Sequence, residues 1–291
     1  MNTLIRAELL KLRTTRTFWW TVVAALAFVP LSIALAIAKI GTPDGTSLDS
    51  VEGFRNVIAA ASSGGMLVLL IGIMVMAGEF RFNTITSTFL ITPQRKRVVA
   101  AKLAASSLVG ITIAAVSSSL TLAIALPWLA SRHVDVASHS TDIVIVLLGG
   151  IAATALSGMV GVGVCALVTN QTLAVTVTLT WLLLVEAMVV SFAPGLGRWL
   201  PGGAAGAMSG AATYSNLLPA GAAALLFAGY GLAFAAAGSR FVCAEAGGFT
   251  GPAASSRCVR PAAGASATRS PSANASWSSS TARAGAAARS R

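Results

Sequence analysis

The chain has 291 residues, of which 55% are hydrophobic and only 10% are charged, and its formal net charge is +11. A soluble domain carries roughly 25% charged residues, so this composition and a mean hydropathy of +0.80 exclude an ordinary soluble enzyme and place the chain among membrane proteins. The basic residues flank apolar runs instead of gathering on one folded face, which argues against a nucleic-acid partner.

The first 17 residues are polar and basic, and their apolar residues recur at helical spacing. Ile5, Leu9 and Leu12 fall on one face of a helix, while Arg6 falls elsewhere. The pattern predicts an amphipathic helix over 1–17 that lies in the membrane interface. The alternative is a plain basic flank that only orients the first span. We expect no cleavable signal peptide, because the apolar run that follows is long enough to cross a membrane.

Six apolar segments have about the length that a helix needs to cross a bilayer core roughly 30 Å thick. We predict spans at 18–39, 57–77, 103–127, 143–168, 171–193 and 217–237. The fold class is therefore an all-α membrane protein, with a six-span transmembrane domain over 18–240. If the amino terminus is inside, sixteen basic residues lie inside and four outside, or nine against four without Arg240 and the tail. The positive-inside rule then predicts a multi-pass protein of the cell membrane with both termini cytoplasmic.

Two segments outside the spans have an unusual composition. Residues 194–216 are rich in Pro and Gly, and their apolar parts are too short to span, so we predict re-entrant or interfacial helices, with a surface loop as the alternative. Residues 241–291 are mostly Ala, Ser, Gly, Arg, Pro and Thr, without apolar periodicity. We expect this tail to be disordered. It is either a basic extension that touches anionic lipid or the product of a shifted reading frame.

Motifs for nucleotide binding and for metal catalysis are absent from the sequence. It contains neither a G-x-x-x-x-G-K-[ST] phosphate loop nor an H-E-x-x-H metal motif. We therefore expect no enzyme activity, no metal site and no cofactor in this chain.

Glu186 is the one ionisable residue well inside a predicted span. An acid at such a depth costs about 3 kcal/mol on the insertion scale, so its carboxyl should face protein or water. Two interpretations remain open. Glu186 is a polar site on a transport path, or it makes a structural hydrogen bond to a neighbouring Ser, Thr or Trp.

A charged, helix-competent stretch lies between the second and third spans, over residues 79–102. Its basic residues are Arg81, Arg95, Lys96, Arg97 and Lys102. Such a stretch belongs on the cytoplasmic side, where it can receive force from a soluble partner. Because proline disfavours helix at the residue before it, Pro93 predicts a cytoplasmic helix over 79–92.

This stretch resembles the cytoplasmic loop of permease subunits of type-2 ABC exporters. The resemblance rests on Gly78-Glu79-Phe80-Arg81, Thr84-Ile85, Thr88-Phe89-Leu90, Pro93, Arg95, Arg97 and Ala101-Lys102-Leu103. Val185-Glu186 and Arg198-Trp199-Leu200-Pro201-Gly202 are similar to that family's fifth span and the outside segment after it. The resemblance covers about residues 1–242.

The resemblance implies the permease subunit of an ATP-driven exporter, which couples ATP hydrolysis by a separate ATPase subunit to substrate export. The loop would be a coupling helix, in which the ATPase is met by Glu79, Arg81, Thr84 and Thr88, and Pro93, Arg95 and Arg97 return the chain to the membrane. The permease would pair with a second copy or a paralogue, and ATP and Mg²⁺ would lie on the ATPase subunits. Alternatives are a non-transporting immunity or regulatory subunit and an ion-coupled carrier that uses Glu186.

Overall fold

The structure is a computed structural model that describes residues 2–40, 42, 50–81, 95–134, 136, 138–168, 170–210 and 218–248. These residues belong to the first of two units, Met1–Phe249, and the second unit, Thr250–Arg291, lies outside the described residues. The elements in the described part are all helical, so the all-α prediction is confirmed.

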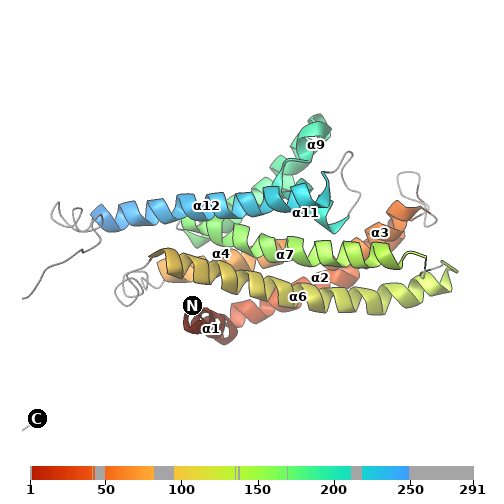
Figure 1. The fold of residues 1–291 in the computed structure, drawn as a ribbon, viewed down its shortest axis with the longest axis horizontal. Coiled ribbons are helices and arrows are strands. Elements are labelled where there is room, and N and C mark those ends of the chain that lie inside the picture. The colour runs from red at the N-terminus through yellow and green to blue at the C-terminus, as the bar shows by residue number, and fades with distance from the viewer. Residues whose placement is uncertain are drawn as a thin grey trace, which may run out of the picture. The chain divides into compact units, whose positions relative to one another are not determined.

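The helices follow one another along the chain with short connections. In order they are α1 (Asn2–Thr14), α2 (Arg16–Lys39), α3 (Val51–Ala59), a 3₁₀ turn η1 (Ala60–Ser62), α4 (Gly65–Arg81), α6 (Arg95–Ser131), α7 (Ser140–Val168), α8 (Gln171–Thr180), a π-helical turn η2 (Trp181–Val185), α9 (Glu186–Phe192), α10 (Pro194–Gly197), α11 (Pro201–Ser209) and α12 (Ala220–Gly248). The end of α4, the start of α6 and the end of α12 lie toward one end of the bundle, and α3 lies toward the other (Figure 1).

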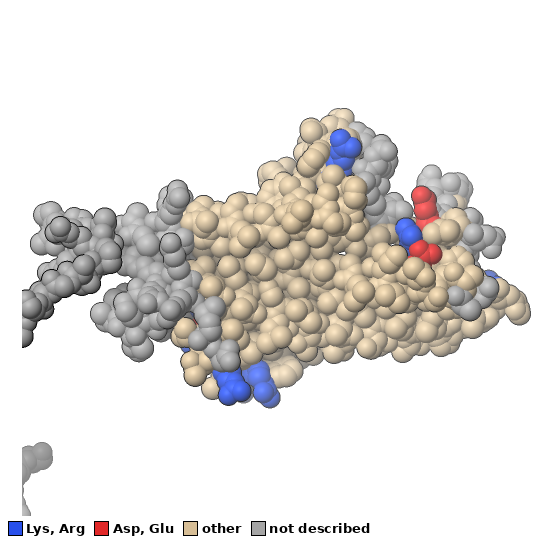
Figure 2. Space-filling model, viewed as in Figure 1, with Lys and Arg blue, Asp and Glu red and all other residues tan. Residues whose placement is uncertain are grey.

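Six helical segments of the described part are long and apolar enough to cross a membrane. They are Arg16–Lys39, Val51–Gly78, Val98–Ser131, Ser140–Val168, Gln171–Phe192 and Ala220–Gly238. Each contains most or all of one predicted span, so the six-span prediction is confirmed. Charged side chains on the visible face lie at its periphery, and the broad middle carries none, as a face in contact with lipid requires (Figure 2).

The second span begins earlier than predicted and is broken. Val51 starts α3 because the Ser50 hydroxyl caps it by accepting a hydrogen bond from the Gly53 N–H at 3.1 Å. The helix then tightens through η1 and restarts at Gly65. The break lies at a run of small residues, where the Ser63 hydroxyl meets that of Ser32 in α2 at 3.0 Å.

Helix α7 lies at the centre of the bundle and packs against α4, α6, α11 and α12. Small residues in α7 allow this close packing. A Cβ atom on Gly161 would fall on the carbonyl oxygen of Leu69 in α4, and one on Gly163 would come within 2.7 Å of the Phe234 Cβ in α12. Backbones therefore approach closely on two sides of α7.

We expect Gly161→Ala to destabilise the fold by about 1–3 kcal/mol, because the added methyl group meets a backbone carbonyl that cannot move aside. Gly229→Ala in α12 is the matched control, since no atom lies within 4 Å of its added Cβ. Unfolding of the two purified variants in detergent micelles measures the difference. Equal stability of the two variants would contradict this packing of α7.

Two segments near the carboxyl end contain helices, one where we predicted short helices and one where we predicted the start of a disordered tail. Residues 194–216 contain the short helices α10 and α11, and α11 packs on α7 and α12. The last helix continues to Gly248, past the boundary that we placed at 241. The residues after 240 include Ala244 and Ala246. Alanine has a high helix propensity, which allows the helix to continue although this segment lacks apolar periodicity. The rest of the predicted tail lies outside the described residues.

Candidate functional site

The predicted coupling segment joins two neighbouring helices at one end of the bundle. Glu79 and Arg81 lie in the last turn of α4, as a continuation of that helix, and Arg95 and Arg97 lie in the first turn of α6. The side chains of these four residues are outside the described part. So are Thr84, Thr88 and Pro93 as a whole, and the predicted helix over 79–92 therefore stays a prediction beyond Arg81.

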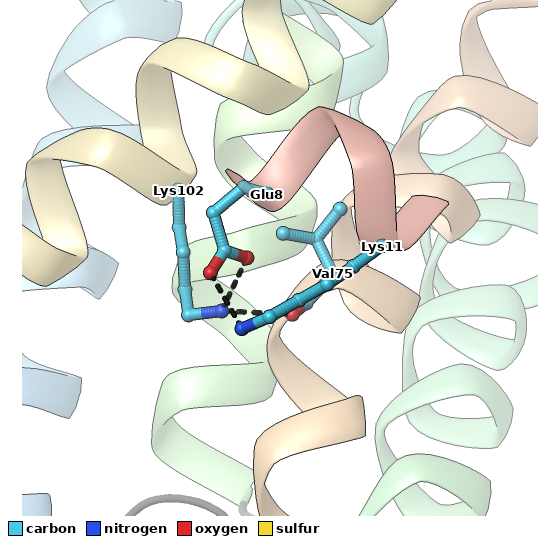
Figure 3. Close-up of polar contacts among 4 residues, drawn as sticks. All are labelled: Glu8, Lys11, Val75 and Lys102. Carbon is cyan, nitrogen blue, oxygen red and sulfur yellow. Dashed lines mark hydrogen bonds and ion pairs between the residues drawn. The ribbon is translucent and has the colours of Figure 1, made fainter. Parts of the chain in front are cut away.

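Next to this segment, a buried cluster of charges joins three helices (Figure 3). The Lys102 ammonium donates to the Glu8 carboxylate at 2.7 Å and to the Val75 carbonyl at 3.3 Å. Lys11 donates to the other oxygen of Glu8 at 3.0 Å. The Lys102 side chain is only 2% exposed and that of Glu8 10%, whereas that of Lys11 is 56% exposed. Lys102 and Glu8 therefore form a buried ion pair, and Lys11 closes it at the surface.

The helix geometry explains why these residues meet. Glu8 and Leu12 are four residues apart on one face of α1, and that face turns inward, since Leu12 belongs to the main apolar core. Helix α6 has 37 residues and is about 55 Å long at 1.5 Å per residue, which exceeds a bilayer core of roughly 30 Å. It begins at Arg95, before the predicted span start at 103, and Lys102 lies in this first part of the helix.

Sequence reasoning counted Lys102 among the basic residues of the segment and in the Ala101-Lys102-Leu103 part of the family resemblance, and it did not single out Glu8. A signal was present. Glu8 is the only acidic residue before Asp44, and it lies on the apolar face of an otherwise basic helix. A lone acid on such a face predicts a buried cationic partner, but it does not say which one.

Glu186 is the second polar group of interest, and its carboxylate caps α11. The residue is 2% exposed and follows η2, the π-helical turn of the fifth span. One of its oxygens accepts a hydrogen bond from the Gly203 N–H at 2.9 Å, across 17 residues of sequence. Leu200, at the N-cap position of α11, has no side-chain acceptor to offer. Glu186 therefore satisfies an N–H that α11 leaves free, and its charge suits that helix end.

The surroundings of Glu186 are tight on the side of α11. A Cβ atom on Gly202 would lie 2.5 Å from the Glu186 Oε1 atom. The preceding turn is held by the Tyr230 hydroxyl of α12, which donates to the Trp199 carbonyl at 2.8 Å. The second oxygen of Glu186, Oε2, is buried and has no hydrogen-bond partner within the described residues. The partner of Glu186 is thus a backbone N–H, whereas the structural one of our two interpretations named a Ser, Thr or Trp side chain.

We expect Glu186→Gln to change stability by less than about 1 kcal/mol, because the amide oxygen can still accept from Gly203. Glu186→Leu leaves that N–H buried without a partner and should cost about 1–3 kcal/mol. Unfolding measurements and a transport assay on the three proteins separate the two roles. A well-folded Glu186→Gln protein that no longer transports would instead place Glu186 on the path.

Comparison with known protein families gives one match that covers most of the described helices. The profile of the family described as ABC-2 family transporter protein matches residues 4–186. The chain belongs to this family. The matched range begins within α1, includes the Glu8–Lys102 pair, and ends at Glu186. A comparison with curated proteins finds no match.

Membership of the ABC-2 family fixes the general role of the chain. It is a permease-type, multi-pass membrane component of an ABC system, and the family implies an ABC ATPase partner in general. Members of this family are generally non-catalytic, in keeping with the expectation from sequence motifs.

Proposed function

We propose that this ABC-2 protein is the permease subunit of an ATP-driven exporter and that a separate ABC ATPase docks on the segment between α4 and α6. One observation carries the proposal. The Lys102–Val75 contact joins the end of α4 to the start of α6, so the two helix ends that flank the segment are held next to each other. A displacement of a segment that connects these two helix ends would be transmitted to two membrane-spanning helices at once.

The ATPase would contact Glu79, Arg81, Thr84 and Thr88. Pro93 would end the coupling helix, and Arg95 and Arg97 would return it to the membrane. ATP and Mg²⁺ would be held by two ATPase subunits, whose closure shifts the permease only as far as it binds one conformation better than the other. A second permease copy or a paralogue would complete the path through the cell membrane.

The proposal requires the segment to be cytoplasmic, and both termini with it. Reporter fusions at Ser138 and Gly202 should therefore read outside, and a fusion at Gln94 should read inside, because the charge bias and the even number of spans agree. Alkaline phosphatase and green fluorescent protein fusions make a suitable pair of reporters. A cytoplasmic signal from Ser138 would break the six-span arrangement.

Purification of the full chain from native membranes tests the proposed partner. We expect an ABC ATPase to co-purify, and we expect ATP hydrolysis by that ATPase to rise when the permease is present in proteoliposomes. Transport driven by a proton gradient without ATP would favour an ion-coupled carrier. An ATPase that binds the permease but supports no transport would favour a regulatory subunit.

A further inference from the structure

The ion pair between Glu8 and Lys102 attaches α1 to the helix bundle, which a helix that only lies on the membrane surface would not require. Helix α1 is mostly exposed, and it reaches the bundle mainly through Leu12, Leu9 and the Glu8 carboxylate. Lys102 holds that carboxylate with the same ammonium group that contacts the Val75 carbonyl of α4. One buried cation therefore connects α1, α4 and α6.

We propose that Glu8 and Lys102 are positioning residues that make α1 part of the coupling unit. In this account α1 moves as one body with the cytoplasmic ends of α4 and α6. The inference rests on the proposed function for the source of the movement, namely an ATPase that acts on the segment between these helices. The connection itself rests on the two contacts of the Lys102 ammonium, one with the Glu8 carboxylate and one with the Val75 carbonyl.

The position of Val75 makes the connection short. In an α-helix the carbonyl of Val75 is paired with the N–H of residue 79, so the Lys102 ammonium lies on the turn that leads directly to Glu79. Lys102 itself lies seven residues after Arg95, the first residue of α6. A displacement of the segment that tilts either helix end therefore moves the ammonium, and with it the Glu8 carboxylate.

The connection is stable only while both charges of the pair are present. A buried ammonium with a carboxylate at hydrogen-bond distance is stable as a pair, but each member alone is an uncompensated buried charge. Loss of either member should release α1 from the bundle. Replacement of both members by apolar residues removes the buried charges and should let α1 dock again through packing.

The first measurement uses the full chain in proteoliposomes and needs no ATPase. Nitroxide labels are placed on cysteines introduced at Leu10 of α1 and Leu108 of α6, which are both exposed, after the three native cysteines have been replaced by alanine. Pulsed electron resonance should give one narrow distance distribution in the parent protein. Glu8→Gln and Lys102→Met should each broaden it, Glu8→Leu/Lys102→Met should restore it, and Lys11→Met should leave it unchanged. Narrow distributions in both single variants would overturn the connection.

The second measurement tests coupling, with the ABC ATPase that co-purifies with the full chain. Glu8→Gln should reduce the permease-dependent part of ATP hydrolysis about tenfold, as expected for a lost coupling free energy of about 1.4 kcal/mol. The amount of bound ATPase and its KM for ATP should not change, and the double variant should recover the stimulation. A merely structural role would lower the amount of complex instead.

The outcomes separate the two proposals. If α1 is released by Glu8→Gln but stimulation stays at the parent level, the coupling role of the pair is wrong and the proposed function stands. If the parent protein itself neither binds nor stimulates an ATPase, the proposed function is wrong, and the coupling role falls with it. In that case the distance measurement still decides whether the pair holds α1 on the bundle.

Discussion

Replacing Lys102 by methionine is expected to lower the free energy of unfolding by about 3–5 kcal/mol, because it leaves the buried Glu8 carboxylate without its closest cation. Methionine fills a similar volume, so the loss reports the charge and not a cavity. Lys11 remains in contact with Glu8, but its side chain is 56% exposed. A solvated ammonium stabilises the buried carboxylate less than the buried Lys102 ammonium does. Chemical unfolding of the purified chain in detergent micelles measures the effect.

Two further variants control this measurement. Lys11→Met removes only the exposed partner and should cost less than about 1 kcal/mol. Glu8→Leu/Lys102→Met removes the whole ion pair and should be close to the parent protein in stability, since apolar pairs often replace buried ion pairs without loss. A double variant as unstable as Lys102→Met alone would contradict the account of the cluster as a buried ion pair.

Reversing the two charges at the end of α4, as Glu79→Arg/Arg81→Glu, should uncouple the permease from its ATPase. Both residues lie beyond the apolar span Val51–Gly78, so neither has to be buried in lipid and the membrane fold should persist. Like charges brought together at an interface oppose binding. We expect stimulated ATP hydrolysis to fall by a factor of roughly 5–150, the range of typical coupling energies.

The control for this reversal is a charge change on the side that we predict to be outside. Arg132 is exposed, and its guanidinium lies over the Trp128 ring at 5.7 Å. Arg132→Glu should leave ATPase binding and stimulation at the parent level. Equal losses from Arg132→Glu and from the reversal at Glu79 and Arg81 would show that the effect is not specific to the coupling segment.

The comparison of sequence and structure separates local from distant information. The six spans follow from apolar length alone, and the glycines of α7 that allow its close approach to neighbouring helices are visible in the sequence. The early start at Val51 also had a local cause, the cap at Ser50, which an apolar-length criterion overlooks. Features with a local cause were therefore predictable even where we placed their ends wrongly.

Polar contacts between distant residues were not predictable in the same way. Glu8 and Lys102 are 94 residues apart, and Glu186 reaches Gly203 over 17 residues. Sequence analysis identified Glu186 because an acid within a span is costly, yet its partner is a backbone N–H, a group that every residue except proline carries. Residue types can thus indicate that a buried charge needs a partner, while only the packing of α1, α6 and α11 decides which one.

Cysteine cross-linking in native membranes tests the central claim most directly. Single cysteines at positions from 79 to 92, in a chain whose three native cysteines are replaced by alanine, are paired with cysteines on the surface of the co-purifying ATPase. We predict cross-links from one face of this segment and none from Ser138 on the opposite side. A stable complex in which no position from 79 to 92 cross-links to the ATPase would contradict the coupling assignment.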